Sequence, residues 1–100
     1  MKLLTQEIKS RIPKLYSQEH VEDPIIHVKF FTPWSNWTWY ATEAEYDEEY
    51  KTWRFFGLID GHEKELGYFL LSELESVQGP YGLKIERDRH FGTPHLNTVQ

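Results

Sequence analysis

Aromatic and β-branched residues gather in short segments separated by turn residues, and this spacing restricts the chain to a small sheet. The segments expected as strands cover residues 25–32, 37–43, 52–60, 66–71 and 83–88. Pro33-Trp34-Ser35-Asn36 and Asp60-Gly61-His62 have turn chemistry, so they connect neighbouring strands as hairpins. Residues 44–51, between the second and third segments, are expected as an acidic loop. The pattern therefore predicts an antiparallel meander of four to five strands.

Two short helices accompany the predicted sheet. Apolar residues among the first fifteen share one helical face, and they are Leu4, Ile8, Ile12 and Leu15. Thr5 is expected to cap this helix, and Pro13 is expected to end it. Ser72-Glu73-Leu74-Glu75 fits a capping box, which predicts a short helical segment after the fourth strand. The predicted fold class is α+β, a small antiparallel sheet with the N-terminal helix packed on one face.

Large apolar side chains occupy both faces of the predicted strands, because successive residues of a strand point to opposite faces. Phe30 and Phe31 are neighbours in the sequence, as are Phe55 and Phe56. The N-terminal helix can cover one face only, so the second face needs the C-terminal segments, another subunit or a ligand. One hundred residues make a single domain, 1–100, and about the last nine are expected as a loosely held tail, 92–100.

The composition excludes several classes of function. Without cysteine the chain has no disulfides, thiolate zinc sites or cysteine nucleophiles. The net charge of −5 argues against a protein that coats DNA. No apolar run is long enough to span a membrane, so we expect a cytoplasmic protein without membrane contact. The histidines match no zinc motif, and no phosphate-binding loop or nucleophile elbow is present, so no metal or cofactor is expected.

Aromatic residues make up 16% of the chain, and tryptophans concentrate around the first hairpin. Interfaces are enriched in such side chains, so Trp34, Trp37 and Trp39 are the expected contact with another protein or with a second copy of the chain. Five carboxylates follow and are expected to steer a basic partner, and they are Glu43, Glu45, Asp47, Glu48 and Glu49. The alternative for this acidic run is a solvated hairpin loop whose charges oppose aggregation.

A metal-dependent nuclease or hydrolase is the alternative from the enzyme class. Its site would combine four carboxylates, and they are Glu73, Glu75, Glu86 and Asp88. Two carboxylates two residues apart within residues 86–90 suit a divalent cation, but surface ion pairs explain the same run. A single-strand nucleic-acid binder that stacks bases on its aromatic residues is a third hypothesis. It is less favoured because the tryptophan hairpin lacks positive charge.

The chain resembles a bacterial domain family of unknown function over nearly its whole length. The resemblance rests on VKFFTPW at residues 28–34, WTWYATE at 37–43, FFGL at 55–58, ELGYF at 65–69, LSELE at 71–75 and GPYGLKIERD at 79–88. It implies an accessory protein of plasmids, integrative elements and phage-like islands, encoded among DNA-processing and anti-defence functions. It implies no activity, cofactor or catalytic residue. Together with the missing catalytic motifs, it favours a non-enzymatic protein that binds a component of DNA transfer, replication or host defence.

Overall fold

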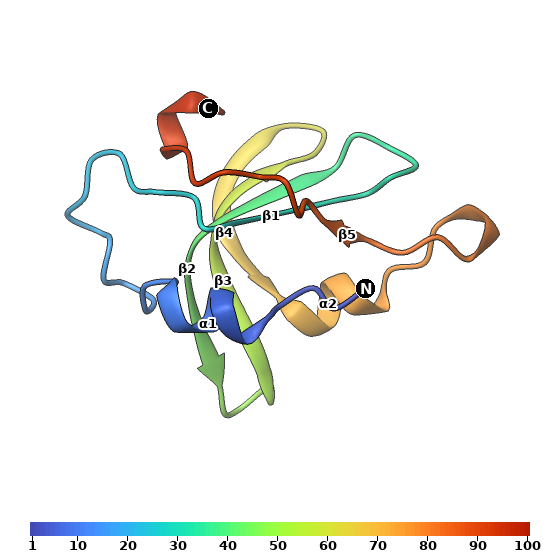
Figure 1. Ribbon diagram of the computed structural model, residues 1–100, viewed down its shortest axis with the longest axis horizontal. Helices are drawn as coiled ribbons and strands as arrows, with labels where there is room; N and C mark the ends of the chain where they lie inside the picture. Colours follow the sequence, from blue (N-terminus) through green and yellow to red (C-terminus); the bar gives the residue numbers. More distant parts are fainter.

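One antiparallel sheet forms the centre of the computed structural model, which describes residues 1–100 (Figure 1). Its strands lie in the order β4–β3–β2–β1–β5. Their bounds are Val28–Phe31 (β1), Thr38–Asp47 (β2), Thr52–Asp60 (β3), Lys64–Leu70 (β4) and Glu86–Arg87 (β5). The helices are Gln6–Arg11 (α1) and Leu71–Ser76 (α2), with single 3₁₀ turns at Pro80–Gly82 (η1) and Leu96–Thr98 (η2). The predicted α+β class, with an N-terminal helix and a helix after the fourth strand, is confirmed.

Two of the differences from the predicted strands change how the sheet is paired. β2 continues to Asp47 because residues 44–47 pair with β3, so the expected acidic loop shrinks to a turn over residues 48–51. The last strand is only Glu86–Arg87, shorter than the expected 83–88, and it pairs with β1. The strands β1 to β4 therefore form the predicted meander, and β5 adds to its far edge.

The helix ends follow their local chemistry. The Thr5 hydroxyl accepts a hydrogen bond from the Ile8 amide at 3.3 Å, and α1 ends at Arg11, two residues before Pro13. The second helix begins at Leu71, so Leu70 rather than the expected Ser72 is its N-cap, because the Glu73 carboxylate accepts the Leu70 amide at 2.9 Å. Neither helix has the length and apolar character that crossing a membrane requires.

The larger core lies on the face of the sheet against which α1 and α2 pack (Figure 1). It contains twelve buried residues, among them Ile8 from α1 and Leu74 from α2. The rings of Phe30 and Phe55 meet edge to face at 5.4 Å, and the Phe69 ring stacks on Phe55 at 5.2 Å. The apolar stripe of α1 therefore docks on the sheet as its spacing predicts.

A smaller core lies on the opposite face and consists of Ile26, Leu58 and Leu96. The Ile26 amide donates to the Pro94 carbonyl over 2.8 Å, which holds the C-terminal segment across this face. Within residues 92–100, for which the sequence predicts a loosely held tail, Leu96 is buried against this face. The chain's own C-terminal segment is the cover for this part of the second face.

A β-bulge at Thr42 changes which residues of β2 face each core. The pairing with β3 shifts by one residue between Ala41 and Glu43, and the Thr42 hydroxyl donates to the Phe56 carbonyl at 3.2 Å. Because paired residues share a face, Glu43 lies on the second face with its partner Phe56. Ala44 returns to the larger core beside Ala41. Regular alternation would instead place Ala41 and Glu43 on the same face.

The close approach of β2 and β3 at Gly57 gives a direct test of this register. A Cβ at Gly57 would lie 1.8 Å from the Tyr40 carbonyl oxygen, whereas a Cβ at Gly67 of β4 would meet only the Ile59 side chain, at 3.8 Å. We expect Gly57→Ala to lower the free energy of unfolding by about 2–3 kcal/mol. The control Gly67→Ala should change it by less than about 1 kcal/mol. Urea denaturation followed by tryptophan fluorescence measures both, and equal effects would contradict the register.

Candidate functional site

The tryptophans predicted to bind a partner are half-buried on the face that the helices cover. Trp34 and Trp39 pack against the larger core, and a Cβ at Gly79 would overlap the Trp34 indole, with the nearest ring atom 2.4 Å away. Trp37 stacks on Trp39 with ring centroids 5.9 Å apart and meets His62 edge to face at 5.5 Å. These rings close one end of the core, so only part of each indole faces solvent.

The predicted acidic run separates into buried and exposed members. Glu43 is 4% exposed, and its two carboxylate oxygens accept the amides of Tyr16 at 2.9 Å and Gln18 at 2.7 Å. Asp47 accepts the Tyr50 amide at 3.0 Å and pairs with Arg54 at 2.9 Å. The Tyr50 amide and then Arg54 lower the pKa of Asp47 below its usual value. The exposed carboxylates are Glu45, Glu48 and Glu49.

The carboxylates of the nuclease hypothesis do not come together as a metal site. Glu73 is occupied at the start of α2, where it accepts the Leu70 amide at 2.9 Å. Asp88 lies beside β1, where its carboxylate is 3.7 Å from the Lys29 amine. No group of three or more histidine, aspartate or glutamate side chains is arranged to hold a metal ion. The side chains of Glu73, Glu75, Glu86 and Asp88 therefore have structural partners or stand apart.

An uncovered groove lined by apolar side chains lies on the second face, beyond the end of the C-terminal cover. We call it the tyrosine groove and define it by Tyr16, Val21, Phe56, Leu66 and Tyr68. It encloses about 310 Å³ between residues 16–24 and the strands β3 and β4. Tyr16 is 59% exposed, Leu66 is 51% exposed and Tyr68 is 45% exposed. These three side chains therefore place exposed apolar surface beside the hollow.

Aromatic contacts shape this groove. The Tyr68 ring packs on Phe56 at 5.0 Å and beside Tyr16 at 6.3 Å. Hydrogen bonding to the Tyr16 side chain raises the pKa of Tyr68 above its usual value. The Arg54 guanidinium lies 5.9 Å from the Tyr68 ring and 5.3 Å from the ring of Tyr50, which carries the aromatic surface beyond the groove. Rigid tyrosines with few rotatable bonds suit a contact surface, because little entropy is lost on binding.

The backbone at Tyr16 depends on the buried carboxylate of Glu43. Tyr16 has a φ of 70°, a left-handed conformation that costs energy for a residue with a Cβ. Glu43 binds the amides on both sides of this turn, at Tyr16 and Gln18. Charge-assisted hydrogen bonds of this type are the strong ones, and they offset the backbone strain. The carboxylate thereby fixes where the Tyr16 ring stands in the groove.

Charge around the tyrosine groove is predominantly negative. Glu19 and Glu22 stand on its rim in addition to the buried Glu43. Arg54, whose guanidinium lies 5.9 Å from the Tyr68 ring, is paired with Asp47 at 2.9 Å. The groove therefore offers apolar rings beside unpaired carboxylates, an arrangement that suits apolar and positively charged groups of a partner.

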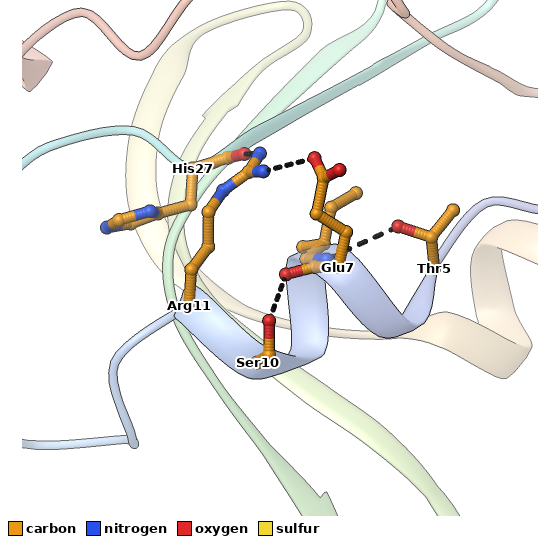
Figure 2. Close-up of polar contacts among 6 residues, drawn as sticks. Thr5, Glu7, Ser10, Arg11 and His27 are labelled. Atoms are coloured by element: carbon orange, nitrogen blue, oxygen red, sulfur yellow. Dashed lines mark hydrogen bonds and ion pairs between the residues drawn. The ribbon is translucent and has the colours of Figure 1, made fainter.

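A second hollow of about 390 Å³ lies between α1 and β5, and it is polar. Figure 2 shows Arg11 of α1 reaching Glu7 on its own helix, at 2.8 Å, and the carbonyl of His27, at 2.9 Å. Arg87 donates to the Leu3 carbonyl at 3.2 Å and to the Lys2 carbonyl. Both guanidinium groups are thus engaged in holding the N-terminal segment and α1 to the sheet.

Sequence reasoning missed the residues of the tyrosine groove. Leu66 and Tyr68 alternate in β4 on the same face as Phe56 of β3, and this alternation is visible in the sequence. It indicates an exposed aromatic surface only if β4 is a sheet edge, and if Tyr16 folds back over the sheet from a segment that has the composition of a polar loop. The second condition follows from the bulge that turns Glu43 toward the second face, and a one-residue irregularity has no reliable signature in the sequence.

Removing the buried carboxylate tests its structural role. Glu43→Gln keeps the size of the side chain but places an amide donor against one backbone amide. We expect this change to lower the free energy of unfolding by about 2 kcal/mol, because a buried amide loses its acceptor. The control Glu45→Gln, at an exposed position of the same strand, should change it by less than about 0.5 kcal/mol. If urea denaturation gives equal values for the two variants, Glu43 does not anchor the turn at Tyr16.

His27 gives a pH test of the packing around α1. Its Nδ1 atom is buried without a hydrogen-bond partner, and burial followed by the Arg11 charge lowers the pKa of His27 below its usual value of 6.5. The folded state thus favours the neutral ring. The contribution of the neutral His27 ring to the free energy of unfolding is present above pH 6.5. It is lost as the pH falls, because the unfolded chain has the higher His27 pKa and takes up the proton first.

We therefore expect the free energy of unfolding to fall between pH 7.5 and pH 5.5, and to fall less steeply in His27→Gln. His20→Gln removes an exposed histidine and should keep the slope of the unmodified protein. Urea denaturation at a series of pH values measures the slopes. An unchanged slope in His27→Gln would show that His27 is not the responsible group.

Comparison with known proteins places the chain in a family. No curated protein and no solved structure matches it. A family model does match, and the match runs from residue 3 to residue 99, which includes both helices, all strands and every residue of the tyrosine groove. The chain therefore belongs to the family described as "Protein of unknown function (DUF2958)".

Proposed function

We propose that the chain is a non-enzymatic protein-binding module, a cytoplasmic accessory protein of bacterial mobile elements that acts on a component of DNA transfer, replication or host defence. The observation that carries the binding proposal is the tyrosine groove, where Tyr16, Leu66 and Tyr68 stand about half exposed beside unpaired carboxylates. The mobile-element setting rests on the resemblance of the motifs at residues 28–43 and 65–88.

The chemistry of the groove supports a protein partner. Tyrosine is enriched among the residues that contribute most to binding energy in interfaces, and a hollow next to it accepts an anchoring side chain. Negative charge on the rim opposes the phosphates of a nucleic acid. Binding a basic protein surface is the activity that remains consistent with these features.

The first hairpin is a competing location for the contact. Its tryptophans are half-buried. The next hairpin, β2–β3, projects from the sheet in Figure 1, and it has Glu45 exposed in β2 and Glu48 and Glu49 exposed in its turn. Charges at such a position act mainly on the rate of association with a basic partner. We therefore assign the groove to the contact and the hairpin carboxylates to steering.

Affinity capture from a bacterial lysate with paired variants tests this assignment. Leu66→Ser/Tyr68→Ser removes two exposed apolar side chains of the groove, and Tyr81→Ser/Leu83→Ser removes a matched exposed pair outside it. We expect the control to retain the captured protein and the groove variant to lose it, with an affinity at least about tenfold weaker.

Glu48→Lys/Glu49→Lys should retain the captured protein while lowering its association rate, measured by biolayer interferometry at low salt. Equal capture by the groove variant and the unmodified chain would place the contact elsewhere. Loss of capture in Trp37→Ser alone, with folding intact by circular dichroism, would return the contact to the first hairpin. Absence of any specific protein would remove the proposal.

A further inference from the structure

We infer that the partner binds as an extended strand that pairs with the free edge of β4, a proposal that rests on the protein-binding function and names the form of the partner. β4 is the outer strand on one side of the sheet, and its only neighbour is β3. It is seven residues long and contains neither proline nor a bulge. Natural sheets usually protect such an edge, because its unpaired backbone groups are a template for another strand.

The direction of the free backbone groups follows from the end of β4. The Leu70 amide donates to the Glu73 carboxylate of α2 at 2.9 Å, which indicates that it points away from β3. Backbone groups alternate in direction along an antiparallel strand, so the amides and carbonyls of Leu66 and Tyr68 also point away from β3. Neither residue takes part in any of the backbone hydrogen bonds formed outside the regular elements. Each therefore presents one donor and one acceptor at the edge.

The opposite edge of the sheet, at β5, is covered by other parts of the chain. Free backbone groups are therefore a feature of the β4 edge and not of both edges. β5 is two residues long, and the Arg87 amide donates to the sulfur of Met1 at 3.1 Å. The Arg87 guanidinium also bonds to the carbonyls of Lys2 and Leu3. The N-terminal segment thus covers the β5 edge, whereas no segment of the chain pairs with the edge of β4.

The same two residues join the edge to the groove. The side chains of Leu66 and Tyr68 lie on the second face and line the tyrosine groove, while their backbone groups face outward in the plane of the sheet. A strand paired with them would place every second side chain over the groove. In strand addition, backbone hydrogen bonds supply affinity and pockets for alternate side chains supply specificity. The edge and the groove together meet both requirements.

The negative charge around the β4 edge favours a basic partner over a second copy of this chain. Around the edge lie Glu19 and Glu22 on the groove rim, Glu65 within β4 and Glu73 beyond its end. The one lysine of β4, Lys64, is engaged with the Val99 carbonyl at 2.8 Å. Two copies paired through β4 would bring these like charges together on chains that each carry a net charge of −5. A segment that alternates apolar residues with lysine or arginine complements the site instead.

Selection of peptides followed by amide hydrogen exchange tests the inference. A phage library of random twelve-residue peptides is selected against the immobilised full-length chain, and an enriched peptide is then synthesised as the ligand. We expect enriched peptides to carry net positive charge and alternate apolar with polar residues. In two-dimensional NMR of the free chain, the amides of Leu66 and Tyr68 should exchange fast while those of Glu65 and Gly67 are protected. Saturating peptide should slow exchange at Leu66 and Tyr68 at least tenfold.

Two variants of Leu66 separate the contribution of the backbone amide to peptide binding from that of the side chain. Leu66→Pro removes the outward amide, and Leu66→Thr removes the apolar side chain but keeps the amide. Proline is tolerated at an edge position whose amide has no partner in the sheet. We expect Leu66→Pro to weaken peptide binding at least tenfold more than Leu66→Thr does. The exchange measurement on the unmodified chain decides the question if the proline variant fails to fold.

The outcomes distinguish the inference from the function on which it rests. A peptide that binds without slowing exchange at Leu66 and Tyr68 overturns strand addition and leaves a protein-binding module. Failure to enrich any peptide overturns strand addition, and failure of lysate capture in addition overturns the binding function. Slow exchange at these two amides in the free chain, with a dimer mass by light scattering, would make a second copy the occupant and overturn the basic partner.

Discussion

Apolar side chains on both faces of one small sheet impose the constraint on which the rest of the structure depends. The two helices and the N-terminal segment cover the first face and enclose the larger core. The remaining chain is long enough to lay Leu96 and its neighbours over Ile26 and Leu58, but it leaves Phe56, Leu66 and Tyr68 beside an open groove. Incomplete cover of the second face is therefore the physical origin of the proposed binding surface.

The bulge in β2 connects this constraint to the shape of the groove. It turns Glu43 to the second face, where the carboxylate is buried and holds the amides of Tyr16 and Gln18. A buried charge is stable only when it is hydrogen-bonded, so the turn at Tyr16 and the carboxylate depend on each other. A residue that appears in the sequence as part of an acidic patch thus builds one wall of an apolar site.

Strand and helix positions could be predicted from the sequence where local chemistry decides them. Residues 52–60 form β3 as expected, and Thr5 caps α1 as expected, because propensity and capping act over a few neighbours. The extension of β2 to Asp47 could not be predicted in this way, since carboxylates disfavour strands and only pairing with β3 overrides that preference.

The candidate site was harder to predict because it depends on tertiary placement. The tryptophans give the strongest aromatic signal in the sequence, but packing against the core and against Gly79 covers much of them. The exposed aromatic surface is made by tyrosines that come from a loop and from an edge strand. Which strand forms an edge, and which loop folds over it, follows from strand order and from a single bulge rather than from residue type.

Hydroxyl-radical footprinting of the chain, alone and bound to its captured partner, tests the central claim most directly. Oxidation in the free chain should be high at Tyr16, Leu66 and Tyr68, and partner binding should reduce it there while leaving Tyr81 unchanged. Protection confined to the tryptophans of the first hairpin, or low oxidation of the groove residues in the free monomer, would contradict the account.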